Sequence, residues 1–180
     1  MVEFDRQPVL SSDVLLLRPL LPEDVEALRE IASDRLLWEQ HPAKDRAEPE
    51  GFQRWFDEAL AQGALVAVDR ATGEVIGTSR YAVHDDDLIE IGWTFLARSR
   101  WGGYWNTEMK RLMLAHAFAS PSTVGFAVHE DNIRSQRAVE RLGAVRVGTA
   151  PDSHGRGRNV LFHLYPDAPA VPRDTTATDR

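Results

Sequence analysis

The chain has 180 residues, of which 43% are hydrophobic, and this is enough to bury the core of one domain. Its formal net charge of −7 argues against nucleic acid as the main partner, because binding to a phosphate backbone depends on clustered lysine and arginine. The sequence contains no cysteine, which excludes disulfides, thiolate metal sites and a cysteine nucleophile.

We expect one domain over residues 1–165 and a mobile tail over residues 166–180, which are rich in Pro, Asp, Thr and Ala. No apolar run approaches the roughly 20 residues that cross a bilayer. The first five residues carry two acids and no base, whereas a signal peptide begins with basic residues. The expectation is therefore a cytoplasmic protein without a membrane partner.

The first half of the chain predicts a strand, two helices and a hairpin. The apolar run Val14–Leu17 is typical of a buried strand. Pro22 opens a helix to about Ser33, because proline suits the first helical turn and apolar residues then recur at helical spacing. The remaining elements expected here are a loop over residues 38–48, a helix over residues 49–61 and paired strands over residues 64–68 and 74–81.

The second half of the chain alternates strands with helices. A strand over residues 89–96 is followed by a glycine-containing turn and by a helix over residues 107–118. This alternation predicts a mixed α/β sheet covered by helices. The later elements expected are a strand over residues 123–128, a helix over residues 132–142 and strands near residues 145–148 and 159–164.

The glycine turn is Trp101-Gly102-Gly103-Tyr104-Trp105-Asn106, directly before the helix expected from Thr107. The first N–H groups of a helix have no intrahelical partner, and the aligned peptide dipoles add partial positive charge there. Such a helix start binds phosphate without lysine. The turn therefore raises the question of a phosphate-bearing cofactor, although alone it fits nucleotides, phosphosugars or no ligand.

Two polar residues open the helix that follows the strand at residues 123–128. Asn132 is a suitable N-cap, and Ser135 lies on the same helix face three residues later. Open α/β sheets commonly present ligands at this end of a strand. The alternative is an ordinary N-cap with a serine that faces solvent.

Six short motifs follow one another along the chain: Leu17-Arg18-Pro19-Leu20, Ile76-Gly77, Glu90-Ile91-Gly92-Trp93, Trp101-Gly102, Asn132-Ile133-Arg134-Ser135-Gln136-Arg137-Ala138 and Leu142-Gly143-Ala144. Together they resemble the GNAT superfamily of acetyl-CoA-dependent N-acetyltransferases, and most of all its RimJ/RimL-like branch, which acetylates protein N-termini or small amines. The resemblance extends from about Leu15 to Tyr165. It implies a mostly antiparallel sheet with flanking helices and a central pair of parallel strands that splay apart.

The resemblance implies that acetyl-CoA is the donor cosubstrate and lies between the splayed strands. Its pantetheine arm would pair with the backbone of residues 93–96, and the turn would wrap its pyrophosphate. Arg98 and Arg100 are candidates for phosphate contacts or for ordinary surface residues. The cofactor-binding residues implied are Trp93, Thr94, Phe95, Leu96, Arg100, Trp101, Gly102, Gly103, Tyr104, Trp105, Asn106, Asn132 and Ser135.

The turn departs from the family's usual pattern of Gln or Arg, two residues, Gly, one residue, then Gly or Ala. Counted from Trp101-Gly102, the usual glycine is replaced by Tyr104 and the small residue by Asn106. Counted from Arg100, the glycine position is filled by Gly103, but Trp105 replaces the final Gly or Ala. We prefer the first register because it keeps Asn106 as the N-cap of the helix. A bulky residue at position 104 would crowd the pyrophosphate unless its side chain points away.

Acetyl transfer requires an unprotonated amine, although a lysine-like amine with a pKa of about 10.4 is mostly charged at neutral pH. By resemblance Glu90 is the candidate base; the alternative is a strand carboxylate in a salt bridge. Strict alternation would place Glu90, Gly92 and Thr94 on one side of the strand, with room for substrate beside the glycine. Many relatives use a tyrosine of the last helix as acid. This chain has none there, so Ser135 is the candidate.

The acceptor pocket is expected from the loop after the first helix and from the strand before the central one. The candidate substrate-binding residues are Trp38, His41, Arg80 and Tyr81, each with packing or surface exposure as the alternative. No metal site is expected, because the consecutive residues His129-Glu130-Asp131 point in alternating directions at a strand end.

The expected function is acetyl transfer from acetyl-CoA to a primary amine of a small molecule. Acetylation of a protein N-terminus is the alternative within the same chemistry. A non-catalytic acyl-CoA-binding regulatory module is the alternative from another class, and the fold without any cofactor is a third. The oligomeric state stays open, with a homodimer as one possibility.

Overall fold

A computed structural model describes residues 4–85, 88–119, 123–152 and 155–166. The predicted mobile tail lies outside these residues apart from Pro166. No helix in these ranges is long and apolar enough to cross a membrane.

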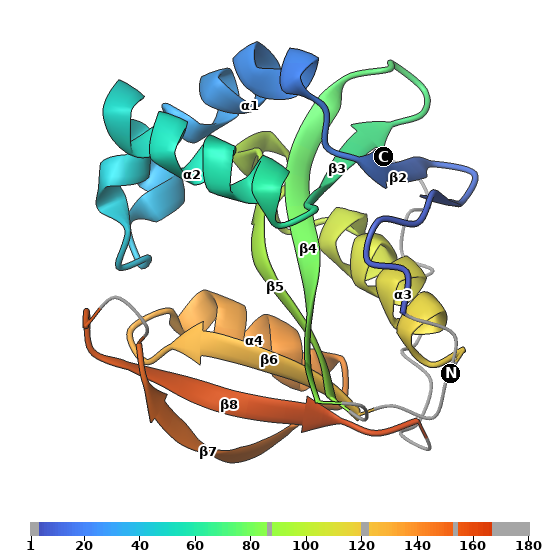
Figure 1. Ribbon diagram of the computed structural model, residues 1–180, viewed down its shortest axis with the longest axis vertical. Coiled ribbons are helices and arrows are strands. Elements are labelled where there is room, and N and C mark those ends of the chain that lie inside the picture. Colours follow the sequence, from blue (N-terminus) through green and yellow to red (C-terminus); the bar gives the residue numbers. More distant parts are fainter. Residues whose placement is uncertain (1–3, 86–87, 120–122, 153–154, 167–180) are drawn as a thin grey trace.

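Eight strands form one sheet in the described part of the chain, in the order β1-β2-β3-β4-β5-β6-β8-β7 (Figure 1). Neighbouring strands pair antiparallel, except for the parallel pair β5 and β6. This confirms the predicted mixed sheet, whereas the two-residue strand β1 was too short to predict. The strands are Leu10–Ser11 (β1), Leu15–Pro19 (β2), Leu65–Asp69 (β3), Val75–Asp85 (β4), Leu88–Leu96 (β5), Thr123–His129 (β6), Val145–Pro151 (β7) and Arg158–Leu164 (β8).

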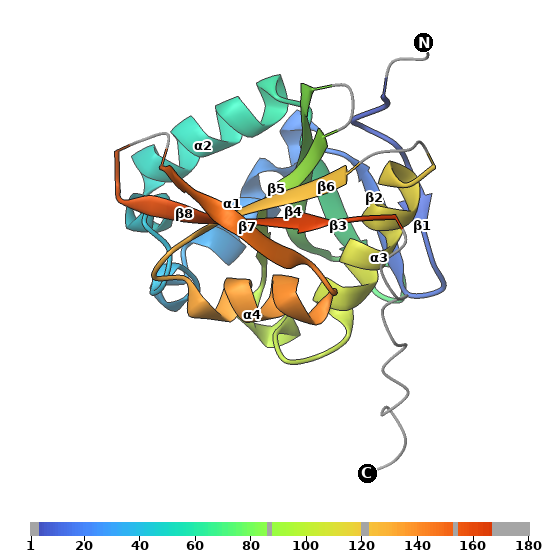
Figure 2. The same ribbon diagram turned by 90° about the horizontal axis from the view of Figure 1, so that it is seen from below.

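Helices cover both faces of the sheet and enclose two hydrophobic cores (Figures 1 and 2). α1 and α2 pack on one face, while α3 and α4 pack on the other. The segment expected to be a loop, residues 38–48, contains a short 3-10 helix and the end of another. The helices are Val25–Ala32 (α1), Pro49–Ala61 (α2), Trp105–Ala117 (α3) and Ile133–Arg141 (α4), with 3-10 turns at Pro22–Asp24 (η1), Arg35–Trp38 (η2), Lys44–Ala47 (η3) and Arg98–Arg100 (η4).

β3 illustrates why central strands of this sheet lack a polar face. Leu65 and Ala67 point into the core with α3, whereas Val66 and Val68 point into the core with α1 and α2. All four side chains are buried. A strand covered on both faces is apolar at successive positions, so its period of two is hidden in the sequence.

The parallel strands β5 and β6 pair over only part of their length. Leu88–Glu90 of β5 pairs with Thr123–Gly125 of β6, and no pairing continues beyond these residues. From there β5 continues along β4, and β6 continues along β8 (Figure 1). The facing edges of residues 91–96 and 126–129 therefore leave backbone groups without a strand partner.

A β-bulge interrupts β5 at this splay. On β4, Thr78 and Arg80 are two residues apart, while their partners Phe95 and Gly92 on β5 are three residues apart. The extra residue coincides with Trp93, whose φ of 52° lies in the left-handed region that non-glycine residues rarely adopt. The bulge places irregular backbone where the two strands separate.

The bulge also corrects the predicted alternation along β5. Glu90 pairs with Ala82, which is two residues from Arg80 and therefore on the same face of β4. Since Arg80 pairs with Glu58 of α2, this face is the one covered by α1 and α2. The Thr94 hydroxyl lies on the opposite side, against α3, because one extra residue inverts the alternation beyond Gly92. The predicted shared side for Glu90 and Thr94 is therefore wrong.

Candidate active site

The glycine turn leads directly into a helix, as predicted, but the helix begins earlier than predicted. α3 starts at Trp105, and the first helical hydrogen bond runs from Glu108 N–H to Tyr104 O. The N–H groups of residues 105–107 precede this bond and have no intrahelical acceptor. Tyr104 is the N-cap and makes no side-chain cap bond, so the preference for Asn106 as N-cap is wrong. Gly102, with φ of 71°, supplies the left-handed turn before it.

The Tyr104 side chain is turned toward solvent. Its ring stacks on Trp105 with centroids 4.8 Å apart, and 41% of the residue is exposed. It lines a shallow cavity of about 400 Å³ together with Asp69 and Arg100. The backbone N–H groups at the helix start, rather than the Tyr104 ring, are the donors in the turn.

The two arginines before the turn bind carboxylates of their own protein. Arg100 forms ion pairs of 3.0 Å with both Asp69 and Glu74, and Arg98 pairs with Asp34 at 2.5 Å. Their expected contacts to cofactor phosphates would have to replace these pairs.

Trp101 links the turn to β5 and to α4. Its indole N–H donates to Leu96 O at the end of β5, with a length of 3.0 Å. The Arg134 guanidinium of α4 lies 3.8 Å from the centre of the Trp101 ring. The turn is thus fixed to β5 on one side and contacts α4 on the other.

The predicted N-cap at Asn132 is confirmed. Its side-chain oxygen accepts a 3.2 Å hydrogen bond from Ser135 N–H, and Asn132 is buried. This leaves the Asn132 amide NH₂ as the group that can donate to a ligand. Ser135 lies in the first turn of α4 and is partly exposed.

A polar cluster beneath the bulge was not predicted. The Lys110 ammonium of α3 donates to Thr94 Oγ1 at 2.7 Å and to Ser79 Oγ at 3.4 Å. Both hydroxyls in turn contact Gly92 O, at 3.3 Å and 3.2 Å. Burial lowers the pKa of Lys110 to about 7. The sequence held one signal that Lys110 is buried, because Lys110 adjoins the apolar stripe of α3 that contains Met109 and Met113.

Glu90 lies at the last residue of β5 that pairs with β6. Its carboxylate and His84 Nε2 are 2.5 Å apart. The His84 side chain is about half exposed, whereas 16% of the Glu90 side chain is exposed. The carboxylate is therefore partly buried and linked through the imidazole to solvent.

Of the two β4 residues expected to line the acceptor pocket, the structure places only one on the side of Glu90. The Arg80 guanidinium stacks 3.6 Å from the Trp93 ring centre and pairs with Glu58 of α2 at 3.5 Å. Tyr81 is buried on the other face, where its hydroxyl donates to Met113 O at 2.8 Å. This corrects the expectation for Tyr81, since adjacent strand residues point to opposite faces.

Of the two pocket residues predicted in the loop after α1, His41 is partly exposed and Trp38 is buried. Trp38 is buried, and its indole N–H donates to Ala32 O at 2.7 Å, so its role is packing and the expectation of a pocket residue is corrected. His41 is partly exposed, and its Nδ1 accepts from Ala43 N–H. Burial and the positive charge of Arg46 lower the pKa of His41 to about 3, so its imidazole is neutral at pH 7.

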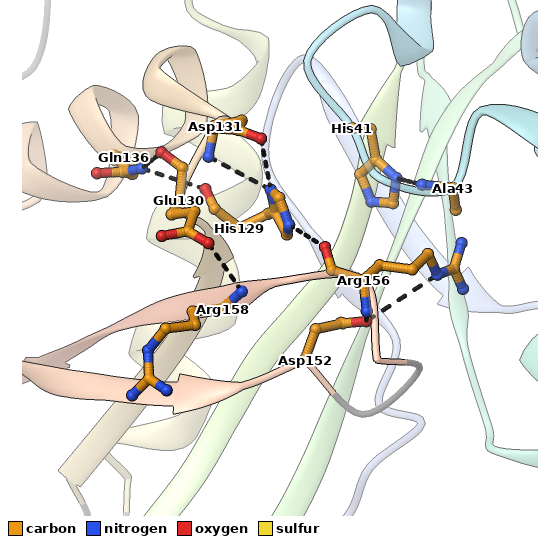
Figure 3. Close-up of polar contacts among 9 residues, drawn as sticks. All are labelled: His41, Ala43, His129, Glu130, Asp131, Gln136, Asp152, Arg156 and Arg158. Atoms are coloured by element: carbon orange, nitrogen blue, oxygen red, sulfur yellow. Dashed lines mark hydrogen bonds and ion pairs between the residues drawn. The ribbon is translucent and has the colours of Figure 1, made fainter.

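Arg156, in the turn between β7 and β8, lies near His41 (Figure 3). His129 Nε2 donates to Arg156 O at 2.7 Å, while its Nδ1 accepts from Asp131 N–H at 3.3 Å. Both ring nitrogens thus have protein partners. Figure 3 shows the Arg156 side chain extending toward the segment at His41.

The sheet divided at one parallel pair, with a glycine turn and helix start beside it, is the architecture of an acyltransferase. The model of the acetyltransferase (GNAT) domain matches residues 14–145. This range is most of the chain, and the chain therefore belongs to the GNAT acetyltransferase family.

Solved structures share this fold at low identity. A GCN5-related N-acetyltransferase from Brucella melitensis is 20% identical with a TM-score of 0.78, over 91% of this chain and 81% of that one. Mycobacterium smegmatis RimJ in complex with CoA-disulfide is 19% identical with a TM-score of 0.65, over 90% and 88%. The ribosomal-protein-S5-alanine acetyltransferase from Vibrio fischeri is 17% identical with a TM-score of 0.63, over 89% and 98%. No curated protein matches the sequence.

Proposed function

We propose that the chain transfers an acetyl group from acetyl-CoA to a primary amine of a small molecule. The observation that carries this proposal is the splay of β5 from β6 at a bulge, with the helix start of α3 nearby and Glu90 on the side of α1 and α2. A donor held along β5 and an acceptor held beside Glu90 would meet at this bulge.

The described residues fit acetyl-CoA as donor. Backbone N–H groups at the start of α3 suit the pyrophosphate, and the unpaired edge of residues 93–96 suits the amides of the pantetheine arm. The Asn132 amide NH₂, at the start of α4, is a further donor. When bound, acetyl-CoA supplies the acetyl group as a thioester.

Glu90 is proposed as the general base. Its carboxylate accepts a proton from the acceptor ammonium, directly or through water, and the His84 imidazole at 2.5 Å offers a path for that proton to solvent. Backbone N–H groups of the bulge polarise the acetyl carbonyl. The amine nitrogen forms the new bond to carbon as the carbon–sulfur bond breaks, and Ser135 donates or relays a proton to the thiolate. The second proton that the nitrogen loses replaces the one taken by the thiolate, directly or through water, so that one proton in all leaves to solvent.

The RimJ/RimL-like branch and the cytoplasmic location are part of this proposal, without a nucleic-acid or membrane partner. Two structural neighbours, RimJ and the ribosomal-protein-S5-alanine acetyltransferase, make a protein N-terminus the second candidate acceptor. The acceptor experiment below decides between a small amine and a peptide.

The test is release of free thiol from acetyl-CoA with a panel of small amines and N-terminal peptides, combined with calorimetry of acetyl-CoA binding. Turnover with small amines and little turnover with peptides supports the proposal. Peptide turnover alone supports N-terminal acetylation. Tight acetyl-CoA binding without turnover on any acceptor supports a non-catalytic module, and no binding at millimolar acetyl-CoA contradicts every acetyl-CoA function.

A further inference from the structure

Three arginines from distant parts of the sequence gather on the side of the sheet that carries Glu90. Arg46 comes from η3, Arg80 from β4 and Arg156 from the turn between β7 and β8. Burial and the positive charges of Arg156 and Arg80 lower the pKa of Arg46 to about 10, even though Glu58 and Asp45 act to raise it. The contacts agree with this, because Arg156 reaches Asp45, the residue next to Arg46 in η3. Arg46 is therefore close enough to Arg80 and to Arg156 for their charges to repel its own.

Two of these guanidinium groups lie over aromatic rings, and in the described residues neither has a carboxylate closer than 3.5 Å. Arg46 lies 5.6 Å from the centre of the Trp38 ring, and Arg80 lies 3.6 Å from the centre of the Trp93 ring. Stacking uses the face of a guanidinium and leaves its N–H groups free to donate at the edge. In the described ranges no carboxylate comes within ion-pair distance of Arg46.

The ion pairs that do reach the cluster are long. Arg80 pairs with Glu58 at 3.5 Å, and Arg156 pairs with Asp45 at 3.8 Å and with Asp152 at 4.0 Å. Arg80 is 8% exposed, and its Nε atom has no hydrogen-bond partner. Arginine pairs elsewhere are short, such as 2.7 Å for Arg18–Asp24, 2.7 Å for Arg35–Glu48 and 3.0 Å for Arg100–Asp69. The cluster thus has donors that the protein itself satisfies poorly.

The cluster adjoins the place where the acceptor amine must arrive. Arg80 lies opposite Gly92 on β5, and Glu90 is two residues from Gly92, which makes Arg80 and Glu90 diagonal neighbours on one face. Diagonal side chains of an antiparallel pair are separated by roughly 7 Å, a distance that a small molecule spans.

We propose that the acceptor amine also carries an anionic group, a carboxylate or a phosphate, which Arg46, Arg80 and Arg156 bind while Glu90 takes the proton from the amine. This proposal rests on the transfer function proposed above and specifies its substrate class. A planar guanidinium binds either anion through two parallel N–H bonds, so the two anions share one recognition chemistry.

The experiment compares matched amines that differ in the anion. Phosphoethanolamine is paired with ethanolamine, and β-alanine is paired with its amide, each assayed for kcat/KM with acetyl-CoA. In the wild type the anionic member of at least one pair is expected to be more than about 10-fold better, which corresponds to one buried charged hydrogen bond. The pair that shows the preference tells a phosphate from a carboxylate.

Variants connect the preference to the cluster. Arg46→Gln is expected to reduce the preference to less than about 3-fold, and Arg46→Lys, which keeps the charge without the planar fork, is expected to lie between. Arg35→Gln removes an exposed arginine of η2 and is the matched control, with the preference unchanged. Equal use of charged and neutral amines by the wild type, or a preference that survives both Arg46→Gln and Arg156→Gln, overturns the proposal.

A binding measurement separates this inference from the transfer function. Phosphoethanolamine and β-alanine are titrated into the wild type and Arg46→Gln by calorimetry with coenzyme A present, so that no turnover occurs. Binding that depends on Arg46, without acetyl transfer to any amine, supports the anion site while the transfer function fails. Turnover of neutral amines without any binding of the anionic ones supports the transfer function while this inference fails.

Discussion

The two sides of the bulge in β5 are built from different parts of the chain. On the donor side, the free edge of residues 93–96 and the helix start at residues 105–107 offer main-chain N–H groups. On the acceptor side, the groups near Glu90 are side chains: His84 contacts its carboxylate, and Arg80 lies diagonally across from it on β4. Arg46 and Arg156 complete the arginine cluster on the same side of the sheet. Under the proposed function, strand and helix geometry would govern donor binding, whereas individual side chains would govern the choice of acceptor.

The largest effect expected on the acceptor side comes from Glu90→Gln. Loss of the carboxylate removes the proton acceptor but leaves the backbone unchanged, so kcat should fall by about 100-fold or more. Acetyl-CoA affinity should stay within experimental error of the wild type. Steady-state kinetics and calorimetry measure the two quantities. Glu50→Gln, in the exposed first turn of α2, is the control. A parallel loss of acetyl-CoA affinity would contradict the separation of the two sides.

The second effect concerns stability on the donor side. The unfolded chain keeps a proton on Lys110 up to about pH 10.5, whereas burial lowers the pKa in the folded chain to about 7. Unfolding therefore takes up a proton between these values, and stability rises with pH in that window. The unfolding free energy of the wild type, relative to Lys110→Met, should increase by on the order of 2 kcal/mol from pH 7 to pH 9.

Urea unfolding at the two pH values measures this increase. Lys44 is the only other lysine and is exposed, so Lys44→Met is the matched control and should show no such change. A pH-independent difference between the wild type and Lys110→Met would show that this lysine is not the buried titrating group.

The third effect tests the glycine turn. Gly102→Ala places a side chain at a φ of 71°, a left-handed conformation that costs alanine about 1 kcal/mol or more. The free turn is expected to relax out of this conformation, so acetyl-CoA would have to restore it and should bind about 5- to 10-fold more weakly. Gly73→Ala is the matched control: it has a φ of 76° and similarly open surroundings, but it lies in the β3–β4 turn. Equal losses of affinity in both variants would remove the turn from the donor site.

The smallest effect is expected for Tyr104. Its ring stacks on Trp105 toward solvent, so Tyr104→Ala should change acetyl-CoA affinity by less than about 3-fold. Calorimetry checks this value. A large gain in affinity would show that the tyrosine crowds the pyrophosphate.

The sequence predicted the donor side better than the acceptor side, for a physical reason. Apolar periodicity, the glycine turn and the Asn132 cap are local signals, and they placed every strand longer than two residues and all four α-helices. The bulge at Trp93 is set by pairing with β4 and leaves no local signal, so the side of Thr94 was assigned wrongly. The start of α3 was predicted too late along the chain, because Asn106 is a good N-cap by residue type alone, whereas Tyr104 is the N-cap in the structure.

The arginine cluster depends on tertiary contacts between segments more than 30 residues apart. Arg80 was predicted as a pocket residue, but Arg46 and Arg156 carry no motif, and only the folded chain brings them together. Lys110 was missed for a similar reason, since a lysine in a helix is usually exposed unless tertiary packing buries it.

Amide hydrogen exchange with and without coenzyme A tests the central claim most directly, because that claim assigns the donor to main-chain N–H groups. Slower exchange is expected at residues 93–96 and 105–107, with no change at residues 43–48 on the acceptor side. Unchanged exchange at both donor segments while coenzyme A binds, or slower exchange confined to residues 43–48, would contradict the account.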